Sequence, residues 1–217
     1  MPYRHIPSIA GYAGESTGGK QFAPAADRNR TALTDLLADI APRTGAALEL
    51  ASGTGQHVVS FAARLPDLAW QPTEIDPARR ASIDAYVREE GLENVAASVA
   101  LDATDAGWGA VHAGKALVVL VNLLHLISDA EARTLITEAA GALAPGGLFV
   151  IYGPFLRGGE LTSEGDAEFH ASLQAQDPET GYKDDFDVMD LLQAAGLEMA
   201  HIVEMPANNL VLAARLP

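Results

Sequence analysis

The sequence predicts a doubly wound α/β fold with a mostly parallel, seven-stranded sheet and an antiparallel last strand. Apolar runs of strand length alternate with helical patterns along most of the chain, an order that builds right-handed crossovers between parallel strands. The last two runs are joined by the short turn "PANN", which favours an antiparallel pair. The seven predicted strands cover residues 46–50, 68–75, 94–101, 116–124, 148–155, 197–205 and 209–216.

Helices are expected between these strands because apolar residues recur there at helical spacing. Pro77 and Gly91 mark the first turn and the end of one helix, and Ser128 or Asp129 caps another. Residues 156–183 form a polar segment without a clear pattern. The predicted helices cover residues 24–42, 55–66, 77–90, 128–147 and 184–196.

At 217 residues, the chain suits one domain with a substantial core. We expect this single domain to span residues 25–217. Residues 1–24 are rich in Gly, Pro and Ser but also hold Tyr3, His5, Tyr12 and Phe22. Because disordered tails are usually poor in aromatic residues, this leader is either flexible or a lid.

Composition excludes several classes of function. The absence of cysteine rules out disulfides, thiolate metal sites and a cysteine nucleophile. A formal charge of −15, without a basic patch, disfavours nucleic acid as a partner, because such binding depends on Lys and Arg. No apolar run is long enough for a membrane span, and the N-terminus lacks a secretory signal. We therefore expect a cytoplasmic protein that acts on a small molecule; its oligomeric state is not predicted.

The stretch "LELASGTGQH", residues 48–57, joins the first predicted strand to a helix. Gly53 and Gly55 permit a tight turn and a close approach of a ligand to the backbone. A dinucleotide site would need a third glycine where Val58 stands, and Glu49 is a poor neighbour for phosphates. A cationic ligand with a ribose fits better, and S-adenosylmethionine, a sulfonium, meets that description.

The same stretch resembles the first motif of Rossmann-like S-adenosylmethionine-dependent methyltransferases, with Ala51 and His57 in place of two family glycines. "TEID", "ALDATD", "VNLLHLI" and "LAPGGLFVIYGPF" resemble the later motifs of that family, in the same order. More narrowly, "ASGTGQH", "FAPAADRN", "YGPF" and "MPANNL" resemble a small, poorly characterised methyltransferase-like family. The resemblance implies transfer of a methyl group from S-adenosylmethionine to a small-molecule acceptor, which leaves S-adenosylhomocysteine.

The resemblance also implies the cofactor residues. Glu74 would bind the ribose hydroxyls, while Asp76 more naturally caps a helix before Pro77. Asp102 would meet the adenine amino group, whereas its rival Asp105 could instead cap the next turn. Glu49 could instead be a buried acid satisfied by backbone amides. The residues expected around the methionine moiety are Glu49, Ala51, Gly53 and Gly55, with Asn122 facing this moiety or the acceptor.

Acceptor contacts are expected from both ends of the chain. Arg28 and Asn29 could clamp a carboxylate of the acceptor or tie the leader down, and the clamp is the favoured role. His57 and His125 are candidate general bases, although a lone histidine is more often a packed side chain, and neither has the spacing of a metal ligand. The remaining candidates for acceptor binding are Tyr152, Pro154, Phe155, Asn208 and Asn209.

Methyl transfer by in-line displacement needs mainly orientation and closeness of the reactants. No Asp/Asn-Pro-Pro-Tyr motif is present, which disfavours methylation of adenine or cytosine amino groups. Two alternatives stay open. One is a non-catalytic cofactor-binding or protein-interaction module on the same fold. The other is an NAD-dependent oxidoreductase, against which Glu49 and the missing third glycine count.

Overall fold

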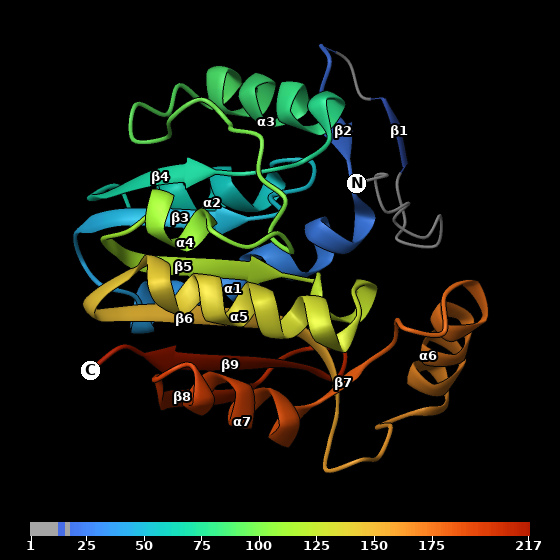
Figure 1. Ribbon diagram of the computed structural model, residues 1–217. Coiled ribbons are helices and arrows are strands. Elements are labelled where there is room, and N and C mark those ends of the chain that lie inside the picture. Colours follow the sequence, from blue (N-terminus) through green and yellow to red (C-terminus); the bar gives the residue numbers. More distant parts are fainter. Residues whose placement is uncertain (1–12, 16–17) are drawn as a thin grey trace.

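The computed structural model describes residues 13–15 and 18–217, and it has the predicted architecture (Figure 1). One seven-stranded sheet has the order β4-β3-β5-β6-β9-β8, with the short strand β7 beside β6. Pairs among β3 to β6 are parallel, whereas β9 is antiparallel to both β6 and β8. The strands are β3 (Gly45–Leu50), β4 (Leu68–Pro72), β5 (Lys115–Val121), β6 (Leu143–Leu156), β7 (Lys183–Asp184), β8 (Glu198–Glu204) and β9 (Asn209–Arg215).

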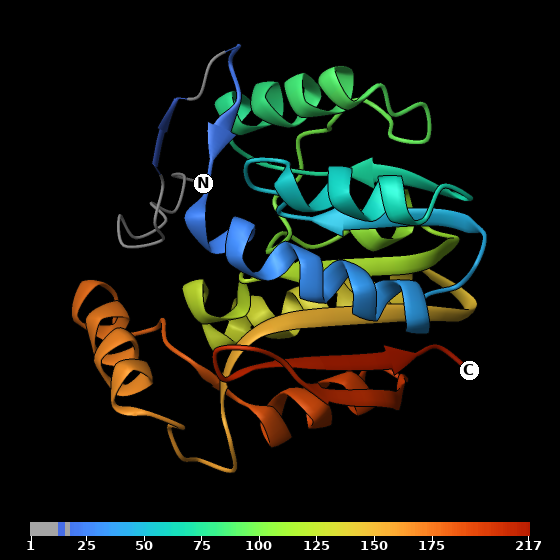
Figure 2. The same ribbon diagram turned by 180° about the vertical axis from the view of Figure 1, so that it is seen from behind.

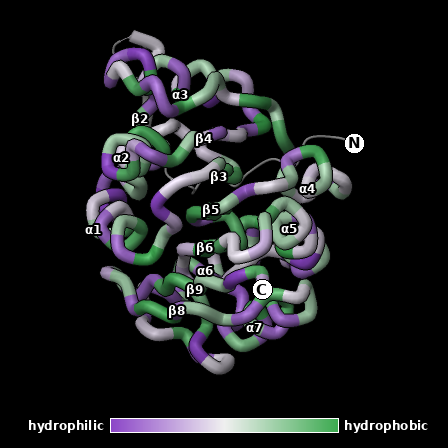
Figure 3. Tube along the Cα trace, turned by 90° about the vertical axis from the view of Figure 1, so that its left-hand side faces the viewer, coloured by the Kyte–Doolittle hydropathy of each residue, from purple (hydrophilic) through white to green (hydrophobic). Residues whose placement is uncertain are grey.

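Helices cover both faces of this sheet, as Figures 1 and 2 show from opposite sides. On one face, α1, α2 and α3 pack on an apolar cluster that includes Phe61 and Trp70. On the other face, α4, α5 and α7 pack on a cluster that includes Leu120 and Phe149. Hydrophobic residues accordingly concentrate along the central strands (Figure 3). The helices are α1 (Pro24–Ile40), α2 (Gln56–Arg64), α3 (Pro77–Glu90), α4 (Trp108–Val111), α5 (Asp129–Ala142), α6 (Glu164–Gln176) and α7 (Asp185–Ala194).

Local signals fix the helix ends. Asp76 caps α3 by accepting the N–H groups of Ala78 and Arg79, and Gly91 ends the helix in a left-handed conformation. Ser128 caps α5 in a capping box with Glu131. The predicted extension of this helix to residue 147 is wrong. The helix ends at Ala142, because Pro145 disfavours a helical conformation in the residue before it.

The predicted strand over residues 94–101 is not continuous. Val95 and Val99 make only isolated parallel bridges to Trp70 and Thr73 at the edge of the sheet. The ladder breaks at Pro72, since proline has no N–H to donate to the neighbouring strand. The segment still runs beside β4, and it delivers residues 101–104 to the same end of the sheet as the strand ends.

Two parts of the structure were not predicted as ordered elements. The first is a two-stranded antiparallel ribbon, β1 (Ala13–Glu15) and β2 (Gln21–Phe22). The N–H of Gln21 donates to Ser82 Oγ at 2.7 Å, which fixes this part of the leader on α3. Tyr3, His5 and Tyr12 of the leader lie outside the described residues.

The second is α6, which lies within the polar segment and stands apart from the sheet layers (Figure 1). Ser163 caps it by accepting the N–H of Asp166. Leu173 and Tyr182 pack with Leu126 in a small apolar cluster of their own. Among the helices of the described residues, none is both long and apolar enough to cross a membrane.

Candidate functional site

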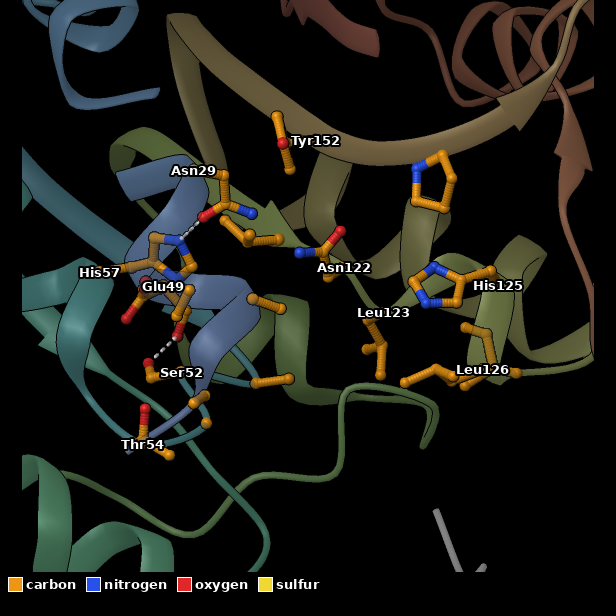
Figure 4. A pocket seen from close by; sticks show the side chains of 18 of the residues that line it. Asn29, Glu49, Ser52, Thr54, His57, Asn122, Leu123, His125, Leu126 and Tyr152 are labelled. Carbon is orange, nitrogen blue, oxygen red and sulfur yellow. Dashed lines mark hydrogen bonds between the residues drawn. The ribbon is translucent and has the colours of Figure 1, made fainter. Parts of the chain in front are cut away.

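A cavity of about 650 Å³ opens at the carboxyl ends of the parallel strands. The chain passes from β3 to β4 on one side and later returns to β5 on the other, and ligands of doubly wound sheets bind at such a reversal of strand order. The cavity is lined by the loops after β3, β4 and β5, by the first turns of α1, and by residues of α6 and the β8–β9 turn. Figure 4 shows it from close by.

The turn after β3 places bare backbone against the cavity. Ala51 and Gly53 both have positive φ angles, of 49° and 57°, and a non-glycine residue in this conformation is costly. A Cβ atom added to Gly53 would meet only the carbonyl oxygen of Ala51, at 4.0 Å. The space beside Gly53 is therefore open to a ligand.

Gly55 has a different role from the one expected. It precedes α2 with a φ angle of 97° and does not line the cavity. A Cβ atom at this position would lie 2.7 Å from the Cα of Ile83 in α3. Gly55 therefore lets α3 approach the start of α2, rather than framing a ligand.

Glu49, near the end of β3, is 1% exposed and lines the cavity. Its Oε2 atom is buried without a hydrogen-bond partner. Burial raises the pKa of Glu49 to about 8, and the negative charge of Glu74 adds to this effect, while a hydrogen bond from Ser52 lowers it. A buried carboxyl group with an unpartnered oxygen is a binding position for a cation or a hydrogen-bond donor.

Glu74 follows β4 and is 2% exposed. Its Oε2 accepts the N–H of Gly53 at 3.0 Å, and its Oε1 accepts the N–H of Asp76 at 3.1 Å. Burial raises the pKa of Glu74, although these two N–H groups and Arg79, 3.9 Å away, oppose the rise. A carboxylate has about four lone-pair sites, so each oxygen can accept one further hydroxyl group.

Asp102 and Asn122 are two further polar residues that line the cavity. Oδ1 of Asp102 accepts both the N–H and the hydroxyl of Thr104, at 2.9 and 2.6 Å. The Asp102 side chain thus closes an Asx turn with the backbone two residues further on. Asp102 lines the cavity and Asp105 does not. Asn122 follows β5 with a φ angle of 55°, and its side chain lies centrally in the view of Figure 4.

A histidine and an asparagine are paired on one side of the cavity. His57 Nε2 lies 2.6 Å from Asn29 Oδ1, and because an amide oxygen only accepts, Nε2 carries the proton. Burial, with a smaller effect of Arg30, lowers the pKa of His57 to about 4, so the ring is neutral at pH 7. Burial raises the pKa of Tyr152, while a hydrogen bond from Asn29 and the charge of Arg28 lower it.

His125 lies on the other side, beside Leu123 and Leu126 (Figure 4). It belongs to a one-turn 3₁₀ helix, Leu124–Leu126, after β5. The rings of Phe169 and Tyr182 lie in T-shaped geometry to the His125 ring, at centroid distances of 5.9 and 6.2 Å. Burial, and to a lesser degree the charge of Lys183, lowers the pKa of His125 to about 4.

Asp166 of α6 ties this aromatic group to the turn between β8 and β9. Its carboxylate accepts the hydroxyl of Tyr182 at 3.0 Å, the side-chain N–H of Asn208 at 3.0 Å and two hydroxyls of the preceding turn. These hydrogen bonds outweigh burial and lower the pKa of Asp166. They also draw α6 over the cavity, which Asp166, Phe169 and Tyr182 line.

Most of the predicted site residues line this one cavity: Arg28, Asn29, Glu49, Ala51, Gly53, His57, Glu74, Asp102, Asn122, His125, Tyr152, Pro154 and Asn209. Phe155 does not, and is 1% exposed in the core. Alternate residues of a strand point to opposite faces, so Phe155 points away from the side of Tyr152. Asn208 contacts Asp166 instead of lining the cavity.

Sequence reasoning missed the contribution of α6. The signal was present, since Ser163 precedes two acids in the pattern of a capped helix and Phe169 and Leu173 are one turn apart. It also missed Thr54 and Thr104, which line the cavity. In the described part of the chain, no group of three His, Asp or Glu side chains could hold a metal ion.

The fold is similar to that of solved methyltransferases. An O-methyltransferase family protein from Burkholderia thailandensis has a TM-score of 0.76 and 21% identity, with 88% of this chain and 57% of that chain covered. The O-methyltransferase family 2 protein from Planctomyces limnophilus, in complex with apigenin, has a TM-score of 0.72 and 17% identity, with 85% and 56% covered. PigF with SAH has a TM-score of 0.70 and 18% identity, with 84% and 54% covered.

This chain therefore spans little more than half the length of the solved structures that it matches, and the likeness establishes its fold. A family profile described as "Protein of unknown function (DUF938)" matches residues 20–215. The chain belongs to this family.

Proposed function

We propose that this member of the family is an S-adenosylmethionine-dependent methyltransferase that acts on a small-molecule acceptor and releases S-adenosylhomocysteine. One observation carries the proposal. Three acids line one cavity: Glu49 near the end of β3, Glu74 after β4, and Asp102 after the segment 94–101 beside β4. Glu49 has a buried oxygen without a partner. The solved structures of the same fold, one of them with SAH, support the choice of cofactor.

The residues present fit this cofactor. Glu49 Oε2 would accept from the ammonium group of the methionine moiety or lie near the positive sulfonium. Glu74 has a free lone-pair site on each oxygen for the two ribose hydroxyls. Asp102 keeps its Oδ2 atom for the adenine amino group, since Oδ1 is the atom that bonds Thr104. The open space beside Gly53 would admit the methionine chain.

When bound, the sulfonium supplies an electrophilic methyl group. The protein contributes orientation and closeness, which are the main requirements of an in-line displacement. Tyr152, His125 and the residues of α6 line the rest of the cavity, where we place the acceptor. Asp166 and the turn between β8 and β9 hold α6 in place, which would help to exclude water from the reacting atoms.

The two histidines are weak bases in this setting. With pKa values of about 4, both are neutral at pH 7 and poorly matched to remove a proton from an acceptor near that pH. We propose that His57 orients Asn29 and that His125 forms part of the acceptor wall. The nucleophile would then enter in a form that needs no general base.

A nicotinamide cofactor is a poorer fit. Val58, where the dinucleotide fingerprint needs glycine, is fully buried in the core. Glu49 would lie close to the pyrophosphate, where a buried carboxyl group offers no positive charge to bind it. A protein that binds the cofactor without transferring a methyl group remains the alternative to turnover, and an acceptor screen separates the two.

The proposal is tested by the variant Glu74→Gln, with Asp105→Asn as a control that removes the same charge from an exposed acid on the next loop. The amide keeps the shape of Glu74 but cannot accept both ribose hydroxyls. We expect Glu74→Gln to weaken S-adenosylhomocysteine binding at least about tenfold, the effect of one charge-assisted hydrogen bond. Calorimetry at pH 8 measures the affinity, and melting curves check the fold. Equal affinities of the two variants would overturn the ribose assignment.

A further inference from the structure

Arg28 differs from the other charged side chains that line the cavity. In the described part of the chain, its guanidinium makes no ion pair and no hydrogen bond. Four acids of the lining have partners: Glu74 bonds Gly53, Asp102 bonds Thr104, Glu131 bonds Ser128, and Asp166 bonds Tyr182. The fifth, Glu49, keeps one buried oxygen without a partner, but a carboxyl group offers no positive charge to an anion. Arg79, the second cation of the lining, lies 3.9 Å from Glu74.

The remaining basic side chains of the lining do not compete for an anion. His57 and His125 are neutral at pH 7, as described above. The other ionisable lining residues are mainly carboxylic acids. Arg28 is thus the cation that an anionic ligand would meet in the described cavity, and the surrounding acids would repel an anion elsewhere.

The position of Arg28 directs its charge into the site. It lies in the early part of α1, directly before Asn29, which bonds His57 at 2.6 Å. Its positive charge acts on the Tyr152 hydroxyl at the far end of β6 and lowers the pKa of that group. Arg28 therefore lines the same cavity as Asn29 and Tyr152, with its charge close enough to affect the Tyr152 hydroxyl.

We propose that Arg28 is the carboxylate-binding residue of this cavity. A guanidinium presents a planar fork of N–H donors that matches the two oxygens of a carboxylate. This inference rests on the proposed function. The carboxylate can come from two sources, the amino-acid end of the cofactor or the acceptor. In the first case, Arg28 and Glu49 would together bind the carboxylate and the ammonium group of one α-amino acid.

The test uses the variant Arg28→Met, with Arg30→Met as its matched control. Arg30 loses the same charge two residues along the helix, but it pairs with Asp27 at 3.2 Å and does not line the cavity. Each protein is titrated with S-adenosylhomocysteine and with 5′-methylthioadenosine, which lacks the amino-acid group. If the cofactor supplies the carboxylate, Arg28→Met weakens S-adenosylhomocysteine binding about 10- to 100-fold, the effect of a charged hydrogen-bonded pair, and leaves 5′-methylthioadenosine binding unchanged.

If the acceptor supplies the carboxylate, S-adenosylhomocysteine binds all three proteins equally. Acetate, benzoate and glutarate are then titrated into protein saturated with S-adenosylhomocysteine. At least one of them binds the wild type and the Arg30→Met control more tightly than Arg28→Met.

Two results overturn the inference, and they can be told apart. If S-adenosylhomocysteine affinity is unchanged in Arg28→Met and no carboxylate distinguishes this variant from the control, Arg28 binds no carboxylate, while the proposed function stands. If the wild type binds neither S-adenosylhomocysteine nor 5′-methylthioadenosine, the proposed function fails and the inference fails with it.

Discussion

Three residues that line the cavity lower the stability of the folded protein, through backbone strain or an unsatisfied polar atom. Ala51 and Asn122 hold left-handed conformations at the ends of β3 and β5, each worth about 1–3 kcal/mol of strain. Glu49 keeps a buried oxygen without a partner, which also costs stability. These three residues meet at one cavity, and a ligand that bonds there would offset part of the cost.

Glu49 makes the stability of the protein depend on pH. Its pKa is about 8 in the folded protein, against 4.5 as the ordinary value. Between these values the folded state holds a proton that the unfolded chain has released, so stability falls as pH rises. His57 and His125, with folded pKa values of about 4, have the opposite effect. They act only below about pH 6.5, where the unfolded chain binds protons.

Between pH 6.5 and 8, the pH dependence of the free energy of unfolding therefore reports on the buried carboxyl groups and not on the two histidines. We expect the free energy of unfolding of the wild type to fall there by up to about 1.4 kcal/mol per pH unit. The variant Glu49→Gln should show a flatter profile, with only the contribution of Glu74, whose pKa is also raised. Urea denaturation at several pH values measures both slopes. Identical slopes would mean that Glu49 is ionised in the folded protein.

Single residues of the site were predictable where chemistry fixes the residue type. The acids Glu49, Glu74 and Asp102, which the resemblance assigned to the cofactor, all line the cavity, while their contacts with a cofactor stay a prediction. Phe155 could not be placed from its motif alone, because its direction depends on the pleat of β6. Asn208 was expected near the acceptor, but its partner Asp166 belongs to a helix that the sequence reading did not find.

Among the elements, the contact between α2 and α3 depends on one glycine. An alanine at Gly55 would need a φ angle of 97° and would place its Cβ atom 2.7 Å from Ile83. We expect Gly55→Ala to lower the free energy of unfolding by about 2–4 kcal/mol, from backbone strain and overpacking. Gly53→Ala, also with a positive φ but with open space, should cost about 1 kcal/mol. Chemical denaturation measures both, and equal losses would contradict the packing role of Gly55.

Elements with strong local patterns were predicted well. Central strands such as β5 are apolar on both faces, and α3 and α5 carry clear capping residues. The break at residues 94–101 was not predicted because it arises in the neighbouring strand, at Pro72. Helix α6 was missed because its apolar positions are few, and Leu173 is its only fully buried residue among those described. Contacts with distant residues, such as Tyr182 and Asn208, stabilise this helix more than its own apolar pattern does.

At the scale of the whole molecule, the fold determines where the cavity lies but does not determine which acceptor the proposed enzyme would take. The reversal of strand order between β3 and β5 places the cavity and its acids at the carboxyl ends of the parallel strands. The opposite wall comes from α6 and the turn between β8 and β9, which the parallel part of the sheet does not dictate. The part of the molecule that was least predictable from sequence would therefore select the proposed acceptor.

The central claim is that this cavity binds S-adenosylmethionine. Isothermal titration of the purified protein with S-adenosylmethionine, S-adenosylhomocysteine and NAD tests it directly. The account predicts one-to-one binding of the first two compounds and none of NAD. Absence of binding for both adenosyl compounds, or tighter binding of NAD, would contradict it.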